Sequence, residues 1–377
     1  MMAFALAMPR KIRFGRGEAR AALPEIAAFG RVALLVHGRD PARVEWAVQG
    51  LRALGMTVLP HPCPAEPTLP MLQEAIRAGQ EADFVIGLGG GAALDLAKAA
   101  AALIPGNADP MDHLEVVGRG LPLGIDPLPF VAIPTTSGTG AEATRNAVIG
   151  VPDHRRKVSL RDERMIARLA IVDPSLTDGC PPAVTLASGL DAITQVIEPY
   201  LCTRANPFTD ALCRDAIPMG LKALRRLMDA EDAEARDSMA WVSLSGGLAL
   251  ANAGLGAVHG LAGPIGGLCD APHGAVCGTL LPHVLRANAE RLEPGSPIAA
   301  RMQDVRRWLS EALGAQDGIG ALERWSRESG LPRLGEMGLA TTDIPAIAEA
   351  AVASSSMKAN PVALSTQELI RILHAAV

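Results

Sequence analysis

Aromatic residues and positive charge are both scarce in this sequence of 377 residues. Aromatics make up 3% of it, and Tyr200 is the single tyrosine. Proteins that bind single-stranded nucleic acid stack the bases on aromatic side chains. The formal net charge is −5, and no cluster of Lys and Arg exceeds the short DHRRK at 153–157. A nucleic-acid or anionic-membrane surface needs more positive charge than this, so we expect neither partner.

The sequence also lacks paired cysteines and long runs of bulky apolar residues. Its six cysteines form no CxxC pair, which predicts reduced thiols and no disulfide framework. The N-terminal MMAFALAMPRK places apolar residues before basic ones, the reverse of a secretory signal peptide. The charge-free stretch 239–269 contains eight glycines, a proline and His259, which suits a buried helical core better than a membrane span. We therefore expect a cytoplasmic protein.

Hydrophobic residues are 49% of the chain and charged residues 20%, which is typical of a globular protein. In the first half, short apolar runs that end at glycine or in a turn alternate with segments of helical periodicity. We expect strands at 31–38, 57–61, 83–91 and 129–140, and helices at 40–55, 68–82 and 93–104. Strands separated by helices predict a parallel sheet, as in Rossmann-like α/β domains.

From about Pro181 onward the strand signals stop, and every strongly patterned segment is helical. The sequence thus predicts an α/β domain over 1–181 and an all-α domain over 182–377. The crevice between two such domains is the default place for a ligand.

Two loops in the first half suit the phosphates of a dinucleotide. In GLGGGAALDLAK, Gly89, Gly90 and Gly91 stand between a predicted strand and helix, where the backbone can approach a phosphate at a helix N-terminus. The pattern is neither GxGxxG nor a P-loop, and a tight turn is the plain alternative. The second loop, IPTTSGTGAEAT, follows the next predicted strand; a hydroxyl-rich surface turn is its alternative. Its hydroxyl residues are Thr135, Thr136, Ser137 and Thr139.

A metal site is suggested in the second half. Asp191 and Gln195 stand at i and i+4 of a predicted helix and therefore share one face. Their surroundings are apolar, where a carboxylate needs a cation or another partner. A buried Asp held by backbone N–H groups is the alternative.

His259 and His273 are separated by glycines and prolines that break the helix between them. Pro272 suits the first turn of a new helix. Two helical segments joined by a bend can aim both imidazoles at one point, whereas one straight helix would hold them about 21 Å apart. His283, after a further proline, is expected to be structural. A competing zinc-compatible set is Cys269, His273 and Cys277, although Pro272 interrupts its spacing.

The chain resembles the iron-containing (group III) alcohol dehydrogenase family over nearly its full length. The resemblance implies a dehydroquinate synthase-like fold, a divalent metal (Fe²⁺ or Zn²⁺) in the cleft, and hydride transfer between NAD(P) and a small alcohol or aldehyde. It further implies a homodimer. The motifs that carry it are GGGAALDLAK, IPTTSGTGAEAT, VDPSLT at 172–177, SGLDAITQVIEPY and HGLAGPIGGLCDAPHGAVCGTLLPHVLRAN.

Carried over by position, the resemblance makes Asp191, Gln195, His259 and His273 the metal ligands, with Asp191, His259 and His273 as catalytic residues. The common pattern has His where Gln195 stands, and a neutral amide oxygen is a weaker ligand than imidazole. It also has a proton-relay histidine at the position of Gly263, so the relay must use water, a ribose hydroxyl or another group.

The motif serines of the two phosphate loops are replaced by Ala92 and Ala141, which leaves the backbone N–H groups in place. NAD-preferring relatives tend to have an Asp at the end of the first long strand, where VHGRD offers Gly38 and Arg39. We expect NADPH to be tolerated, with Arg39 as a phosphate partner or an ordinary surface residue. The full expected cofactor-binding set is Gly38, Arg39, Gly89, Gly90, Gly91, Asp95, Thr135, Thr136, Thr139 and Lys157, the last of these near the nicotinamide ribose.

The sequence is also compatible with several other functions. An enone reductase of the maleylacetate reductase type needs cleft cations, for which Arg145 is the main candidate. Dehydroquinate synthase and glycerol dehydrogenase relatives are further possibilities, although a synthase needs more Lys and Arg in the helical half. Gln195 leaves room for a metal-free reductase on the same fold. A non-enzymatic nucleotide-binding protein is the last rival.

Overall fold

The computed structural model describes residues 3–106, 109–269 and 271–377, which form two compact units. The first, called the α/β unit, comprises Ala7–Thr136 and Gly140–Asp178. The second, called the helical unit, comprises Gly179–Val377 together with Ser137–Thr139 and the N-terminal residues up to Leu6.

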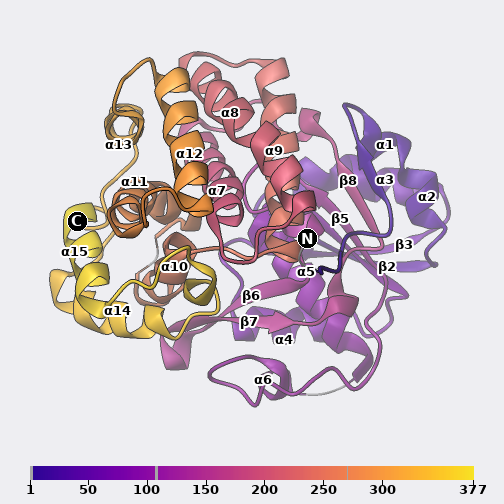
Figure 1. Ribbon diagram of the computed structural model, residues 1–377. Helices are drawn as coiled ribbons and strands as arrows, with labels where there is room; N and C mark the ends of the chain where they lie inside the picture. The colour runs from indigo at the N-terminus through magenta and orange to yellow at the C-terminus, as the bar shows by residue number, and fades with distance from the viewer. Residues whose placement is uncertain (1–2, 107–108, 270) are drawn as a thin grey trace. The chain divides into compact units, whose positions relative to one another are not determined.

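The α/β unit is built on a six-stranded parallel sheet with the order β1-β8-β5-β4-β2-β3, seen in Figure 1. The four strands that the sequence predicts are confirmed as β2, β3, β4 and β5. The structure adds β1, β8 and an antiparallel hairpin, β6–β7. The strands are β1 (Ile12–Phe14), β2 (Val32–His37), β3 (Thr57–Pro62), β4 (Phe84–Gly89), β5 (Phe130–Pro134), β6 (Asn146–Val151), β7 (Arg156–Arg161) and β8 (Leu169–Val172).

Helices cover both faces of this sheet, because alternate residues of each buried strand face opposite ways. Leu34 and Val36 of β2 pack with α4, α5 and the β6–β7 hairpin, whereas Ala33 and Leu35 pack with the helices α1 to α3. The helices are α1 (Glu18–Ala21), α2 (Leu23–Ala27), α3 (Glu45–Ala53), α4 (Leu69–Ala78), α5 (Gly91–Leu103) and α6 (Pro110–His113).

The helix expected at 40–55 begins as a 3₁₀ turn. The Asp40 carboxylate caps that turn by accepting a hydrogen bond from the Ala42 N–H, and α3 follows it. The 3₁₀ segments of the chain are Pro41–Val44, Ile104–Gly106, Ala141–Ala143, Pro152–His154, Glu163–Met165, Pro174–Thr177, Thr341–Asp343 and Met357–Ala359.

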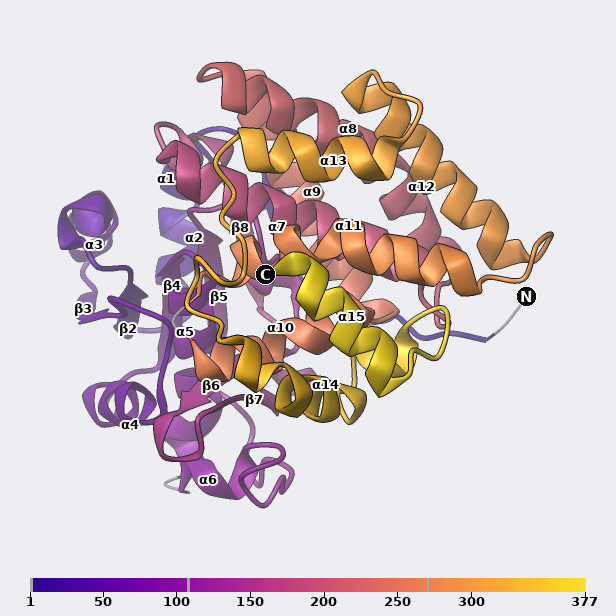
Figure 2. The same ribbon diagram turned by 90° about the vertical axis from the view of Figure 1, so that its left-hand side faces the viewer.

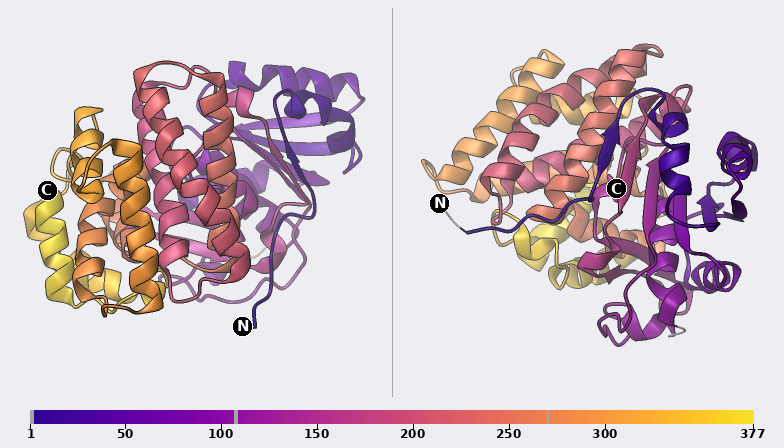
Figure 3. Two further views of the ribbon diagram at one scale, coloured as in Figure 1. Left: turned by 45° about the horizontal axis from the view of Figure 1, so that its top comes forward. Right: turned by 90° about the vertical axis from the view of Figure 1, so that its right-hand side faces the viewer.

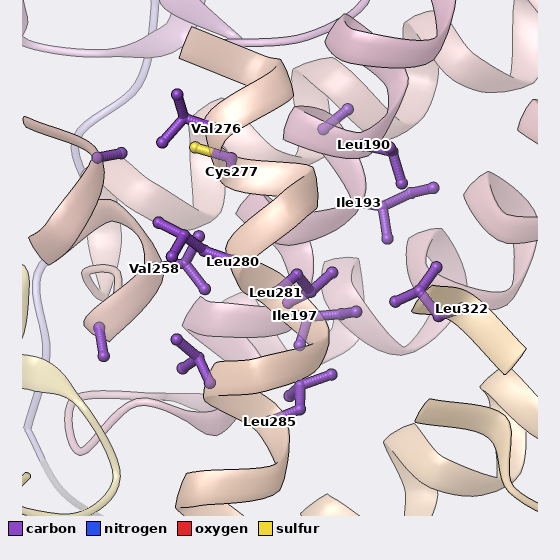
Figure 4. Packing of buried hydrophobic residues seen from close by; sticks show 14 of the residues in the cluster. Leu190, Ile193, Ile197, Val258, Val276, Cys277, Leu280, Leu281, Leu285 and Leu322 are labelled. Atoms are coloured by element: carbon purple, nitrogen blue, oxygen red, sulfur yellow. The ribbon is translucent and has the colours of Figure 1, made fainter. Parts of the chain in front are cut away.

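The helical unit has no strand among its described residues, as the sequence predicts. The long helices α7, α8 and α9 pack side by side (Figure 3), and α11 packs between α7, α13 and α15 (Figure 2). Leucine and isoleucine side chains of α7 and α11 fill the core of this unit (Figure 4). Its helices are α7 (Pro182–Leu201), α8 (Pro207–Asp229), α9 (Ala233–Asn252), α10 (Ala257–Leu268), α11 (His273–Arg291), α12 (Pro297–Leu313), α13 (Gly318–Glu328), α14 (Ile344–Val352) and α15 (Thr366–Ala376).

Among the described residues, no single helix is both long enough and apolar enough to cross a membrane. The helices α9 and α10 meet that test only when they are taken together, and they are bent by 96° at the break between them.

Candidate functional site

Asp191 lies on α7 inside the core of the helical unit, and its side chain is only 2% exposed. Leu190, Ala192 and Ile193 beside it are fully buried. The Asp191 Oδ1 atom has no hydrogen-bond partner among the described residues. A buried, ionised carboxylate without a partner is costly, so this oxygen needs a cation.

His259 of α10 approaches the same carboxylate. Its Nε2 lies 3.4 Å from Asp191 Oδ1, and it too lacks a hydrogen-bond partner in the described structure. On the other side of the ring, Nδ1 lies 2.6 Å from Glu198 Oε2. If Nδ1 carries the proton and donates it to Glu198, the lone pair of Nε2 faces Asp191.

Glu198 is the residue of this site that the sequence analysis missed. It lies on α7, it is 6% exposed, and its Oε1 accepts a hydrogen bond of 2.7 Å from the Val258 N–H. A Cβ at Gly256 would lie 2.8 Å from Oε1, so this glycine makes room for the carboxylate. The signal was present in the sequence, since Glu198 is a second acidic residue two turns after Asp191 on an apolar helix.

The helix α11 begins at His273, as Pro272 predicts, and brings two further donors to the carboxylate. His273 Nε2 lies 3.9 Å from Asp191 Oδ1 and 3.6 Å from Cys277 Sγ. The rings of His259 and His273 are 5.5 Å apart between centroids. The sequence-based expectation that the bend between α10 and α11 aims both imidazoles at one place is confirmed.

Glycines of α11 allow this close approach to α7. A Cβ at Gly274 would lie 2.3 Å from the carbonyl oxygen of Ala187, and one at Gly278 would lie 2.7 Å from the side chain of Leu190. A side chain at either position would push α11 away from α7. The glycines next to His273 and Cys277 therefore set the distance between these donors and Asp191.

The acidic groups of this cluster stabilise the positively charged forms of the two imidazoles, and the imidazoles stabilise the ionised form of Asp191. Burial by itself raises the pKa of Asp191, but the imidazoles of His273 and His259 outweigh it and hold that pKa below its usual value. The electrostatic interaction with Cys277 raises the pKa of His273 to about 9; burial opposes this shift and Asp191 adds to it. Burial lowers the pKa of His259, yet Cys277, Glu198 and Asp191 together raise it well above its usual value.

The residues present fit a divalent metal. One ligand atom each from Asp191, His259, His273 and Cys277 lies within 4.8 Å of the other three. Two of these atoms are buried and lack a hydrogen-bond partner in the described structure, which a metal ion would resolve. Carboxylate oxygen, imidazole nitrogen and thiolate sulfur are all ligands of Zn²⁺ and of transition metals.

Gln195, the fourth ligand expected by resemblance, is buried one turn after Asp191 on α7. Its Nε2 donates a hydrogen bond of 2.5 Å to the carbonyl oxygen of Thr139, a residue that belongs to the helical unit. A Cβ at Gly263 would meet nothing within 4 Å, so the position of the expected relay histidine faces open space.

Cys269, from the competing zinc-compatible set, and His283 both have partners outside the candidate metal site. The Cys269 thiol donates to the carbonyl oxygen of Ile265, and among the described residues it is not part of the cluster of Asp191, His259, His273 and Cys277. His283 Nε2 lies 3.9 Å from Glu323 on α13, in keeping with the structural role expected for it.

The α/β unit gathers most of the predicted phosphate-binding residues at one edge of its sheet. Gly38 follows β2, Gly89 ends β4 and Thr135 follows β5, and these three parallel strands are neighbours. The Thr135 N–H donates to the carbonyl oxygen of Gly89. A Cβ at Gly89 would lie 3.3 Å from the Gly38 nitrogen, and a Cβ at Gly90 would lie 3.4 Å from Thr136 Oγ1. The helix α5 begins at Gly91, so its free N–H groups face this edge.

The remaining cofactor candidates are bound to other protein groups. The Asp95 carboxylate accepts a hydrogen bond from the Val148 N–H, which ties α5 to β6. The Arg39 guanidinium is exposed and donates to the Pro64 carbonyl, and Lys157 pairs with Glu66 at 3.3 Å. Arg145, the cation considered for a dicarboxylate substrate, pairs with Glu163 at 2.8 Å.

Comparison with known proteins gives the same family for both units. The family model of iron-containing alcohol dehydrogenase matches residues 9–174, and the model of the C-terminal part of the Fe-containing alcohol dehydrogenase family matches residues 185–377. Lactaldehyde reductase of Escherichia coli (strain K12) is 35% identical over 353 residues, which are 92% of this chain and 88% of that protein. The 1,3-propanediol dehydrogenase of Klebsiella pneumoniae is 34% identical over 80% of this chain and 78% of its own length.

Solved structures agree with these relatives. A crystal structure of 1,3-propanediol oxidoreductase superimposes with a TM-score of 0.86 at 29% identity, and each chain is covered completely. An archaeal halo-thermophilic alcohol dehydrogenase from a Red Sea brine pool gives a TM-score of 0.90 at 26% identity, again over the whole of both chains. The resemblance seen in the sequence is therefore confirmed. The chain belongs to the iron-containing alcohol dehydrogenase family and is an NAD(P)-dependent oxidoreductase of alcohols and aldehydes.

Proposed function

We propose that this enzyme interconverts small alcohols and aldehydes at a metal centre held by Asp191, His259 and His273. The observation that carries the proposal is the convergence of two buried atoms without partners, Asp191 Oδ1 and His259 Nε2, at 3.4 Å. The small substrate is supported by the lactaldehyde and propanediol named for the relatives.

The residues around the centre each have a task in this proposal. A bound divalent metal supplies Lewis acidity, which stabilises negative charge on the substrate oxygen. Glu198 holds the proton of His259 on Nδ1, so that Nε2 is free to act as a ligand. Because the Gly263 position offers no side chain, we expect solvent or a hydroxyl group of the cofactor to carry the alcohol proton.

We propose that the dinucleotide binds at the β2, β4 and β5 edge of the α/β unit. The N-terminus of α5 and the glycines Gly89 to Gly91 suit its pyrophosphate. Gly38 leaves space for the adenine ribose, and Arg39 can turn from the Pro64 carbonyl to a 2′-phosphate. The Asp95 carboxylate accepts a hydrogen bond from the Val148 N–H and so holds α5 against β6. The proposed cofactor-binding set is completed by Thr135, Thr136, Thr139 and Lys157.

The test combines metal analysis with turnover. Purified protein is analysed for bound metal and assayed for NADH and NADPH oxidation with short- and long-chain aldehydes. We expect His273→Ala to lose metal and activity together, because it removes a ligand. The matched control is His283→Ala, on the same helix but paired with Glu323, which should keep both. Activity that persists in His273→Ala without metal would refute the proposed centre.

We also propose a cytoplasmic homodimer, with 1–181 as the cofactor domain and 182–377 as the metal and substrate domain. None of the six cysteines forms a disulfide bond in the described structure, which suits a reducing compartment. Light scattering of the purified protein tests the oligomeric state, and a monomer mass would contradict it.

A further inference from the structure

We infer that Cys277 is a metal ligand, so that this centre has an oxygen, two nitrogen donors and a sulfur and prefers Zn²⁺. The inference rests on the proposed function, because it names the fourth donor of that same site. Cys277 is fully buried on α11 (Figure 4), and its Sγ belongs to the cluster whose four ligand atoms lie within 4.8 Å of one another.

Two distances among these donors match those of a tetrahedral zinc site, and a third is about 0.5 Å longer. Zinc binds O and N at about 2.0–2.1 Å and S at about 2.3 Å, so neighbouring O and N ligands lie about 3.4 Å apart and N and S about 3.6 Å apart. In this structure Asp191 Oδ1 lies 3.4 Å from His259 Nε2 and 3.9 Å from His273 Nε2. His273 Nε2 lies 3.6 Å from Cys277 Sγ.

The local fold explains why this cysteine reaches the site. Cys277 follows His273 by four residues on α11, so both side chains leave the same face of the helix. Gly274 and Gly278 on the adjoining positions allow the backbone of α11 to approach α7. Cys277 is thereby brought to the two partnerless atoms of Asp191 and His259, which are the independent sign of a cation here.

The alternative fourth donor, Gln195, is less suited to the role. Its amide nitrogen is committed to the Thr139 carbonyl, and an amide oxygen is a neutral, hard ligand. A thiolate is soft and negatively charged, and it selects zinc over magnesium or manganese. Asp191, His259, His273 and Cys277 would then hold the metal, and room for a substrate oxygen would come from an expansion of its coordination beyond four.

Cobalt substitution tests the inference without any assay of activity. Co²⁺ replaces Zn²⁺ in such sites, and a bound thiolate gives it a charge-transfer absorption in the near ultraviolet. We expect this band in the Co²⁺-loaded wild type and its loss in Cys277→Ser. We also expect Cys277→Ser to weaken Zn²⁺ binding by more than the about 10- to 100-fold that loss of an outer partner costs.

Two control variants and two outcomes make the result decisive. Cys269→Ser should keep the band, because that thiol is bound to the Ile265 carbonyl, and Gln195→Ala should keep the band and one Co²⁺ per chain. A wild type that binds Co²⁺ without the band overturns the role of Cys277 but leaves the metal centre intact. A wild type with the band but with no turnover of any alcohol or aldehyde supports Cys277 and refutes the proposed function instead.

Discussion

The replacement of Glu198 by Gln tests how the metal centre is held together. Glu198 is 6% exposed and accepts two hydrogen bonds at once, from the His259 ring at 2.6 Å and from the Val258 N–H at 2.7 Å. Glutamine has nearly the same shape but offers only one acceptor oxygen, and its other end is an NH₂ donor. One of the two N–H groups therefore faces another donor after the substitution.

The magnitude follows from this loss. A buried donor without an acceptor costs about 1–3 kcal/mol, which lowers the stability of the metal-free protein. If the NH₂ end faces His259, the ring turns or takes its proton on Nε2, and the metal loses a ligand. Loss of an outer partner of this kind weakens metal binding by about 10- to 100-fold, or about 1.4–2.7 kcal/mol.

The assay is a Zn²⁺ competition titration against a chromophoric chelator, together with thermal unfolding in the presence of excess chelator. Glu323→Gln is the matched control, because it changes the same residue type beside His283 on α11, outside the cluster. We expect Glu198→Gln to bind Zn²⁺ at least about tenfold more weakly and the control to match the wild type. Equal Zn²⁺ affinity in all three proteins would refute the role given to Glu198.

Three further predictions follow from single contacts. Gly274→Ala places a Cβ against the Ala187 carbonyl, so it should lower Tm and weaken metal binding. The control, Gly263→Ala, has open space around the added Cβ and should leave Tm unchanged or higher. Differential scanning fluorimetry measures both Tm values. Burial raises the pKa of Glu142 to about 7. The folded state therefore holds a proton there that the unfolded state releases, and stability falls by up to about 3 kcal/mol as pH rises from about 4.5 to 7. Glu142→Gln should lose less Tm between pH 5 and pH 8 than the wild type does, and equal losses would contradict this. Arg39→Glu should raise the KM for NADPH about tenfold and leave that for NADH nearly unchanged, because only NADPH carries the 2′-phosphate; an unchanged NADPH KM removes Arg39 from the site.

The sequence predicts the long buried strands and the change to helices because both depend on local patterns. The apolar run in β4 ends in glycines, and the helices after residue 181 carry clear periodicity. It did not predict β6 and β7, since RKVSLR at Arg156–Arg161 is half charged and becomes a strand only by pairing with Asn146–Val151. The strands β1 and β8 are short, and their pairing partners are distant in sequence.

The sequence predicted Asp191, His259 and His273 of the candidate metal site, but not that Glu198 and Cys277 lie beside them. Pro272 and the glycines before it signal the bend that brings His259 and His273 together. Glu198 and Cys277 contribute through contacts between helices, and no spacing along the chain encodes which face of α11 meets α7. The close approach that decides this is set by Gly274, whose meaning is visible only beside the Ala187 carbonyl.

The dependence of activity on bound metal is the most direct test of the central claim that Asp191, His259 and His273 form a metal centre for catalysis. Protein stripped with a chelator is titrated with Zn²⁺, and in parallel with Fe²⁺, while aldehyde-dependent NAD(P)H oxidation is followed. The structure predicts almost no activity in the stripped protein and a linear rise that ends at one metal ion per chain. Full activity in stripped protein that contains no measurable metal would contradict the claim.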